Sequence, residues 1–279
     1  MKMESRMPPV VDCHALVGAG RTWADMDVDY DVNLLLERDA EAGIGRQCVV
    51  PPRNATYAEA NRQVARICEK YAGKLIGYAA DSPQRETGRL RQMLTEEVKS
   101  MGLRGVRSDG QPTREFVDAA LELEIPVMYY PMPGRGQDVG RFFHMPATAY
   151  PQVNFILPHL GKYRSSSWWP HMEAIDLARR YSNVYLDTSG IGSFKYLEMA
   201  ARELPSEKIL FGTCAPELDP RVEREALRLL KLPPDCYAKV AGLDIVRLLG
   251  ESPARYRRLD SNERSARKPP ARLRMVDAG

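Results

Sequence analysis

Long apolar runs, paired cysteines and glycine-rich phosphate loops are all missing from this sequence. No stretch of about 18 apolar residues occurs, which excludes an ordinary transmembrane helix. The first residues, MKMESRMPPVVD, lack the apolar core of a signal peptide. The five cysteines form no CxxC pair, and their odd number argues against a disulfide framework. We therefore expect a cytoplasmic protein whose thiols act singly, with no membrane partner.

Charge is spread unevenly along the chain. The 279 residues are 44% apolar and 28% charged, which is enough to bury one large core. Residues 251–279 contain eight Arg or Lys and four Asp or Glu, so the rest of the chain carries −1 of the total +3. We expect residues 1–250 to form one domain and residues 251–279 to form an extended or disordered basic tail. The tail is expected to dock on its own barrel or on a neighbouring subunit rather than on nucleic acid.

Short apolar runs alternate with segments of helical period, which is typical of βα units. Eight runs are predicted strands: Val10–Cys13, Gln47–Val50, Leu75–Ala80, Leu103–Val106, Val127–Tyr130, Asn154–Leu157, Val184–Leu186 and Lys208–Phe211. A helix is predicted over residues 32–43, with Asp31 as its N-cap and Gly43 at its end, and another over residues 57–73, ending at Gly73. No glycine-rich loop of the doubly wound type follows a strand. The predicted fold class is therefore α/β, a closed (β/α)₈ TIM barrel.

Functional residues of such barrels lie just after the strands, at their carboxyl ends. The residues at these positions are His14, Pro51, Asp81, Arg107, Tyr130, His159, Asp187 and Cys214. The irregular stretch Pro131–Tyr150 is expected to form a mobile loop or lid after the fifth strand. His144 in this stretch and His171 near a helix start are expected in surface or capping roles.

Six segments resemble, in the same order, segments of the amidohydrolase-related family. They are VVDCHALVG, EIPVMYY, FILPHLG, NVYLDTSG, KILFGTCAPE and AGLDIVRLLG, and the resemblance covers roughly residues 9–250. Members similar to this chain are metal-dependent hydrolases or decarboxylases on a TIM barrel. They usually carry Asp-x-His-x-His on strand one, a His ending strand five, a His before Leu-Gly on strand six, and an Asp on strand eight that serves as ligand and general base. Several converging N and O ligands fix a divalent ion there and leave one position open.

The resemblance implies a degenerate metal site in this chain. His14 matches the first strand-one histidine, and His159 matches the strand-six histidine. Leu16, Tyr130 and Cys214 stand where the remaining ligands are expected. Leucine cannot bind a metal, and a neutral tyrosine is a poor ligand. We therefore expect no bound metal.

Three interpretations of the remaining site stay open. His14, His159 and Cys214 could form a His₂Cys zinc site, since a thiolate favours zinc over manganese or magnesium. Alternatively, Cys214 is a nucleophile activated by His159 in a metal-free site, with Tyr130 or Arg107 stabilising negative charge. In the third interpretation Cys214 is a small buried apolar residue, which is commoner for a cysteine just past a strand.

Four further residues are candidates for substrate binding. Arg107 carries a guanidinium suited to a carboxylate substrate, and Asp187 is placed to orient a neighbouring group. Trp168 and Trp169 could wall a pocket for a planar ligand, or could equally pack a helix start against the barrel rim.

Together these features predict a hydrolase or lyase that acts on a small carbonyl or carboxylate compound through an atypical, metal-poor or metal-free site. The alternative is a pseudoenzyme, an inactive family member that serves as a binding or scaffold subunit. A third hypothesis is an ordinary metallohydrolase whose missing ligands come from elsewhere: Asp12, Asp81, Glu217 or Asp219. The expected partners are a small-molecule ligand and either a second copy, as a homodimer, or a paralogous subunit.

Overall fold

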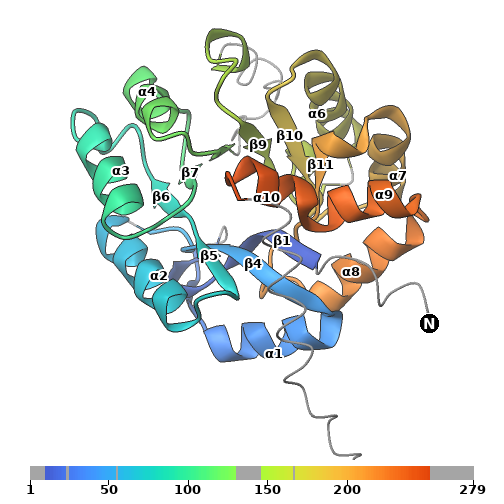
Figure 1. Cartoon of the computed structure of the whole chain (residues 1–279), viewed down its shortest axis with the longest axis horizontal. Coiled ribbons are helices and arrows are strands. Elements are labelled where there is room, and N and C mark those ends of the chain that lie inside the picture. The colour runs from blue at the N-terminus through green and yellow to red at the C-terminus, as the bar shows by residue number, and fades with distance from the viewer. Residues whose placement is uncertain (1–9, 23–24, 55, 130–145, 166, 252–279) are drawn as a thin grey trace, which may run out of the picture.

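The protein is described by a computed structural model, which places residues 10–22, 25–54, 56–129, 146–165 and 167–251. Its strands form a ring surrounded by helices, as the predicted TIM barrel requires (Figure 1). The ring consists of β1 (Val10–Leu16), β4 (Ile44–Val50), β5 (Leu75–Gly77), β6 (Ala79–Asp81), β7 (Val106–Ser108), β8 (Val127–Tyr129), β9 (Phe155–Leu157), β10 (Val184–Asp187) and β11 (Ile209–Leu210).

All strand pairs in the ring are parallel. One ladder runs β1-β4-β5 and the other runs from β6 to β11 in chain order. The ladders join at Tyr78, because the amide of Tyr78 binds β4 whereas the amide of Ala79 binds the residue before β7. A parallel bridge between Ala15 and Ala215 connects β1 to the segment after β11 and closes the barrel.

The strands lie at or near the predicted places. The run predicted as one strand over Leu75–Ala80 forms two strands, β5 and β6. Of the strand predicted over Leu103–Val106, only the last residue belongs to β7, which continues to Ser108. The hairpin of β2 (Gly18–Arg21) and β3 (Asp27–Tyr30) was not predicted, although DVDY alternates polar and apolar side chains; GAGR shows no such alternation.

Nine α-helices are present in the described part of the chain. They are α1 (Val32–Ala42), α2 (Ala58–Lys70), α3 (Leu90–Lys99), α4 (Arg114–Glu122), α6 (Trp168–Arg180), α7 (Phe194–Glu203), α8 (Pro220–Leu229), α9 (Pro234–Ala238) and α10 (Asp244–Leu248), with short turns η2 (Pro158–Gly161), η3 (Ser206–Lys208) and η4 (Lys239–Leu243). The predicted caps of α1 are confirmed, since Asp31 accepts a hydrogen bond from the Asn33 amide and Gly43 adopts φ 70°. Helix α2 ends before Gly73, which takes a left-handed turn at φ 86°. None of these helices has the length and apolar content needed to span a membrane.

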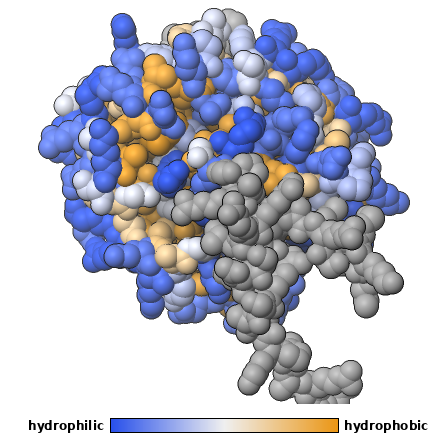
Figure 2. Space-filling model, in the orientation of Figure 1, coloured by the Kyte–Doolittle hydropathy of each residue, from blue (hydrophilic) through white to orange (hydrophobic). Residues whose placement is uncertain are grey.

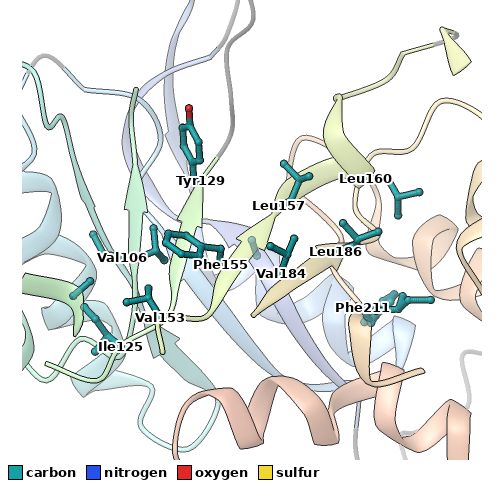
Figure 3. Close-up of a cluster of buried hydrophobic side chains, with 14 of the residues drawn as sticks. Val106, Ile125, Tyr129, Val153, Phe155, Leu157, Leu160, Val184, Leu186 and Phe211 are labelled. Carbon is teal, nitrogen blue, oxygen red and sulfur yellow. The ribbon is translucent and has the colours of Figure 1, made fainter. Parts of the chain in front are cut away.

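Apolar side chains on the strands alternate between two buried clusters. Phe155 and Leu157 of β9 face the layer between strands and helices (Figure 3). Ile156, between them, belongs to the second cluster, which consists mainly of strand residues such as Met128 and Leu210. This alternation follows the period of two of a strand and fixes which side chains point into the barrel. The outer surface is mostly hydrophilic on the face in Figure 2, with a large apolar area at the upper left and smaller ones elsewhere.

Some predictions fall on residues that the structure does not describe. The expected lid over Pro131–Tyr150 is one, apart from a helical turn over residues 146–149. Tyr130, His144 and nearly all of the basic tail also lie outside the described residues.

Candidate functional site

His14 and Asp187 form the base of the candidate site. His14 lies on β1 and Asp187 ends β10, and both side chains are buried. His14 Nδ1 lies 2.8 Å from Asp187 Oδ2. Burial alone would raise the pKa of Asp187, but the hydrogen bond and charge of His14 outweigh it and lower that pKa. Asp187 occupies Nδ1 of His14 in this hydrogen bond, which leaves Nε2 as the ring nitrogen that can bind a metal ion.

His159 lies beside His14, with the two ring centroids 5.1 Å apart. Its Nδ1 lies 3.0 Å from the carbonyl oxygen of Ser189 and 2.9 Å from the Ser189 hydroxyl. Burial, together with the nearby His14, lowers the pKa of His159 to about 4. His159 is therefore neutral near pH 7, which is the protonation state that a metal ligand needs.

Cys214 lies after β11, next to β1, where the first and last strands of the barrel meet. Its backbone amide donates to the carbonyl of His14 at 2.8 Å, and its side chain is buried. Burial raises the pKa of the Cys214 thiol well above its ordinary value, and the charges of Glu217 and Asp187 raise it further. A neutral thiol is a weak nucleophile, so this environment argues against the metal-free interpretation.

Two of these residues have an uncommon backbone conformation. His159 has φ 59° and Cys214 has φ 55°, both in the left-handed region that costs a non-glycine residue about 1–2 kcal/mol. Such conformations persist only where the surrounding contacts enforce them, and they cluster at functional sites. No pattern in the sequence indicated them.

The three side chains are spaced for a metal ion. One ligand atom each from His14, His159 and Cys214 lie within 4.8 Å of one another. Zinc bonds of about 2.0–2.3 Å would place these atoms roughly 3.4–3.7 Å apart, so the group fits zinc after closing by about 1 Å. Nδ1 of His14 is within hydrogen-bond distance of Asp187, and Nδ1 of His159 is within hydrogen-bond distance of Ser189. Metal-binding histidines usually have such a partner at the ring nitrogen that does not bind the metal. The expectation that no metal is bound is therefore not supported.

Arg107 supplies positive charge near this group. It lies on β7, is buried, and its charge acts on both His159 and Cys214. Its Nη2 lies 3.5 Å from the Tyr57 hydroxyl, which in turn donates to Asp109 at 2.7 Å. A buried guanidinium in this position is suited to binding a carboxylate.

The residues proposed as replacement ligands lie elsewhere, with one exception. Asp12 is bound beneath the site by Thr213 and by the His14 amide. Asp81 pairs with Glu97 of α3, and Asp219 caps α8. Glu217 and Asp12 both have charges that act on Cys214, but the Asp12 carboxylate is occupied by Thr213, Gln47 and the His14 amide. Asp81 and Asp219 have other contacts, so Glu217 is the candidate whose carboxylate comes nearest to serving the third hypothesis.

The aromatic and histidine predictions have mixed outcomes. Trp168 and Trp169 begin α6 and are 58% and 50% exposed, with their rings edge to face, so substrate contact stays a prediction. The surface or capping role of His171 is wrong: its side chain is buried, its Nδ1 lies 2.8 Å from the Leu160 carbonyl, and its ring stacks on Tyr196. Periodicity placed this position on a helix but could not show which side faces the barrel.

Ser189 was missed by the sequence analysis. Its hydroxyl donates to Asp187 at 2.7 Å and lies 3.3 Å from Nδ1 of His14 and 2.9 Å from Nδ1 of His159. It thus contacts three members of the site. The available signal was its position two residues after Asp187 in the LDTSG segment, where a short loop brings it back toward the strand end.

Solved structures with the same fold include a decarboxylase with bound manganese and a probable hydrolase. A dihydroxybenzoic acid decarboxylase from Polaromonas, with bound manganese and 2-nitroresorcinol, is 16% identical and has a TM-score of 0.68, covering 88% of this chain and 97% of its own. The 2,6-dihydroxybenzoate decarboxylase from Rhizobium is 16% identical with a TM-score of 0.65 and covers 88% of this chain and 99% of its own. A probable 2-pyrone-4,6-dicarboxylic acid hydrolase from Acinetobacter baumannii, with bound citric acid, is 14% identical with a TM-score of 0.66 and covers 87% and 99%.

At these identities the solved structures support the fold alone. Among curated proteins, none matches the chain. The family model described as Amidohydrolase matches residues 11–250, which contain every strand of the barrel from β4 onward and nearly all of β1. The sequence resemblance and the barrel agree with this match, and the chain therefore belongs to the amidohydrolase family.

Proposed function

We propose that this protein is a zinc-dependent hydrolase or lyase that acts on a small carboxylate compound. The observation that carries the proposal is the convergence of His14, His159 and Cys214, whose ligand atoms lie within 4.8 Å of one another. Three protein ligands that leave one coordination position open are the usual arrangement of catalytic zinc.

The donor set favours zinc over the manganese of the Polaromonas relative. Cys214 replaces a carboxylate by a sulfur ligand, and sulfur ligands select softer ions than manganese or magnesium. Bound zinc would polarise a substrate oxygen and lower the pKa of a water molecule. Asp187 and Ser189 orient the two histidine rings, so that little rearrangement is needed when the ion binds.

Arg107 is proposed to bind the substrate carboxylate. Its guanidinium is buried, and its charge reaches His159 and Cys214. Tyr57 packs near it, with Arg107 Cζ 6.0 Å from the tyrosine ring centroid. A fixed guanidinium binds a carboxylate through two parallel hydrogen bonds, which also orient the substrate. The relatives that bear names of dihydroxybenzoate decarboxylases and of a pyrone dicarboxylic acid hydrolase support this substrate class.

Elemental analysis of protein purified without chelators tests the metal. We expect about one zinc per chain, lost in His159→Ala and Cys214→Ala, because each variant removes one of three protein ligands. Cys236→Ala is the matched control, since Cys236 lies on α9, apart from this group, and should leave the zinc content unchanged. Absence of metal from the wild type, or metal retained by both ligand variants, would contradict the proposal.

Turnover separates the enzyme from the pseudoenzyme. The zinc-loaded protein is incubated with dihydroxybenzoates and with pyrone dicarboxylates, and carbon dioxide release or ring opening is followed. An active protein should lose most of its kcat/KM for carboxylate substrates in Arg107→Ala. A zinc-loaded wild type without turnover of any of these compounds would favour the inactive, ligand-binding alternative.

A further inference from the structure

Glu217 lies in the loop between β11 and α8, beside the candidate metal group. Its Oε1 accepts a hydrogen bond from the Tyr30 hydroxyl at 3.0 Å. The Tyr163 hydroxyl is hydrogen-bonded to the same carboxylate. Tyr30 ends the β2–β3 hairpin and Tyr163 follows η2, so two segments far apart in the sequence hold one side chain.

Both tyrosines connect Glu217 to the metal group. The Tyr163 ring meets the His159 ring edge to face, with centroids 4.9 Å apart. Tyr30 and Tyr163 also pack against the apolar cluster that contains Cys214. In keeping with these contacts, the charge of Glu217 contributes to the raised pKa of the Cys214 thiol. Glu217 is therefore positioned at the site rather than on an outer surface of the barrel.

The site needs a group that can move a proton, and its ligands do not provide one. Cys214 stands where the resembling family has an aspartate that serves as general base. Asp187 is committed to His14 and Ser189, which together donate at least three hydrogen bonds to its two oxygens. Glu217 is only partly buried and lies three residues beyond Cys214, so that its carboxylate can meet a substrate or water entering the site.

We infer that Glu217 is the proton-transfer residue of this site and replaces the missing strand-eight aspartate; the inference rests on the proposed function. In hydrolysis, the Glu217 carboxylate takes a proton from water while the water oxygen forms a bond to the substrate carbonyl carbon and the C=O electron pair moves to oxygen. The proton then passes to the leaving group as its bond to that carbon breaks. In decarboxylation, Glu217 first takes a proton from solvent and then gives it to the substrate carbon that bears the carboxylate. The bond from that carbon to the carboxylate breaks, CO₂ leaves, and the electron pair of the broken bond forms the new C–H bond.

There is a chemical precedent for one set of residues binding the metal while another residue transfers the proton. In zinc deaminases, cysteine and histidine side chains bind the ion while a glutamate that is not a ligand acts as general acid and base. Positioned acid–base groups contribute about 100-fold to 10,000-fold in rate. The two phenols would hold Glu217 in one orientation, which a group with three rotatable bonds needs for efficient transfer.

The test uses the zinc-loaded full chain with Glu217→Gln and Glu217→Ala. We expect both variants to keep the zinc content of the wild type, because Glu217 is not a ligand, and to lose kcat by about 100-fold or more. Added formate should restore part of the kcat of Glu217→Ala, since a small carboxylate can fill the space and carry the proton. A purely structural role would show no such rescue. Glu225→Gln, on the exposed face of α8, is the matched control and should behave as the wild type.

Each result separates the inference from the proposed function. Glu217→Gln with kcat within about threefold of the wild type would overturn the inference alone, with zinc-dependent turnover still established. Loss of zinc from both variants would also overturn it, because Glu217 would then be a ligand or a structural support. If both variants fail to fold, Tyr30→Phe is expected to lower kcat while the zinc content stays the same, and an unchanged kcat there would overturn the inference. A zinc-loaded wild type without turnover would overturn the proposed function, and this role with it.

Discussion

Replacing Glu97 by glutamine is expected to remove part of the pH dependence of folding stability. Glu97 of α3 and Asp81 of β6 are 2% and 0% exposed and lie against each other between the barrel and the helix layer. Neither Asp81 oxygen meets a donor N–H or O–H group in the described part of the chain, and nor does Glu97 Oε2. Glu97 Oε1 accepts from Asn61 at 2.7 Å. A proton between the two carboxyl groups joins Glu97 to one of the Asp81 oxygens.

The direction follows from the proton balance. Burial raises the pKa of Glu97 from 4.5 to about 7. Between pH 4.5 and 7 the unfolded chain has lost this proton while the folded protein keeps it, so the free energy of unfolding falls as the pH rises through this window. Below it both states are protonated, and above it both are ionised. At 1.36 kcal/mol per pKa unit the loss from this group approaches about 3 kcal/mol.

Glutamine cannot ionise, and its amide can donate to the Asp81 carboxylate. Glu97→Gln should therefore equal the wild type near pH 4 and exceed it by up to about 3 kcal/mol at pH 8, or very roughly 5–10 °C in Tm. Urea unfolding followed by circular dichroism from pH 4 to 8 measures this, with Glu96→Gln as the exposed neighbouring control. The reasoning is refuted if the stabilities of the wild type and Glu97→Gln run parallel over this range.

Two further predictions concern other parts of the barrel. A Cβ on Gly212 would lie 2.0 Å from Asp187 Oδ1, so Gly212→Ala should displace Asp187 from His14. We expect this variant to bind zinc about 10- to 100-fold more weakly, as measured by competition with a chelator. An unchanged zinc affinity would contradict this prediction. Asp31→Ala removes the hydrogen bond that the Asn33 amide donates to Asp31 Oδ1 at 2.8 Å; we expect the free energy of unfolding in urea to fall by about 1 kcal/mol, and no change would contradict the role of this cap.

The strand ends were predictable because parallel strands in one barrel share a face. His14 lies on β1, His159 follows β9 and Cys214 follows β11, and their ligand atoms come together although the three segments are far apart in the sequence. Arg107 and Asp187 also lie beside them, since the parallel register brings β7 and β10 to the same end. Apolar patterning identifies strands, and closure of the ring then determines which residues are neighbours.

Other features depend on information that a pattern of residue types does not carry. Asp81 ends a strand like the others, yet it contacts Glu97 in the helix layer rather than the metal group. The left-handed backbone of His159 and Cys214 is imposed by tertiary contacts, since neither residue favours it. Tyr30 reaches Glu217 from the end of the short β2–β3 hairpin, which was not predicted from the sequence.

The seam between the first and last strands has a consequence for how the protein acquires function. Ala15 and Ala215 bridge the seam, and each directly follows a proposed zinc ligand, while the Cys214 amide binds the His14 carbonyl. Ring closure and assembly of the site are therefore one event. A nascent chain that lacks its final strand holds neither a closed barrel nor a complete ligand set, so zinc can report completion of folding. Zinc added during refolding should bind late, and it should slow the opening of the barrel at this seam.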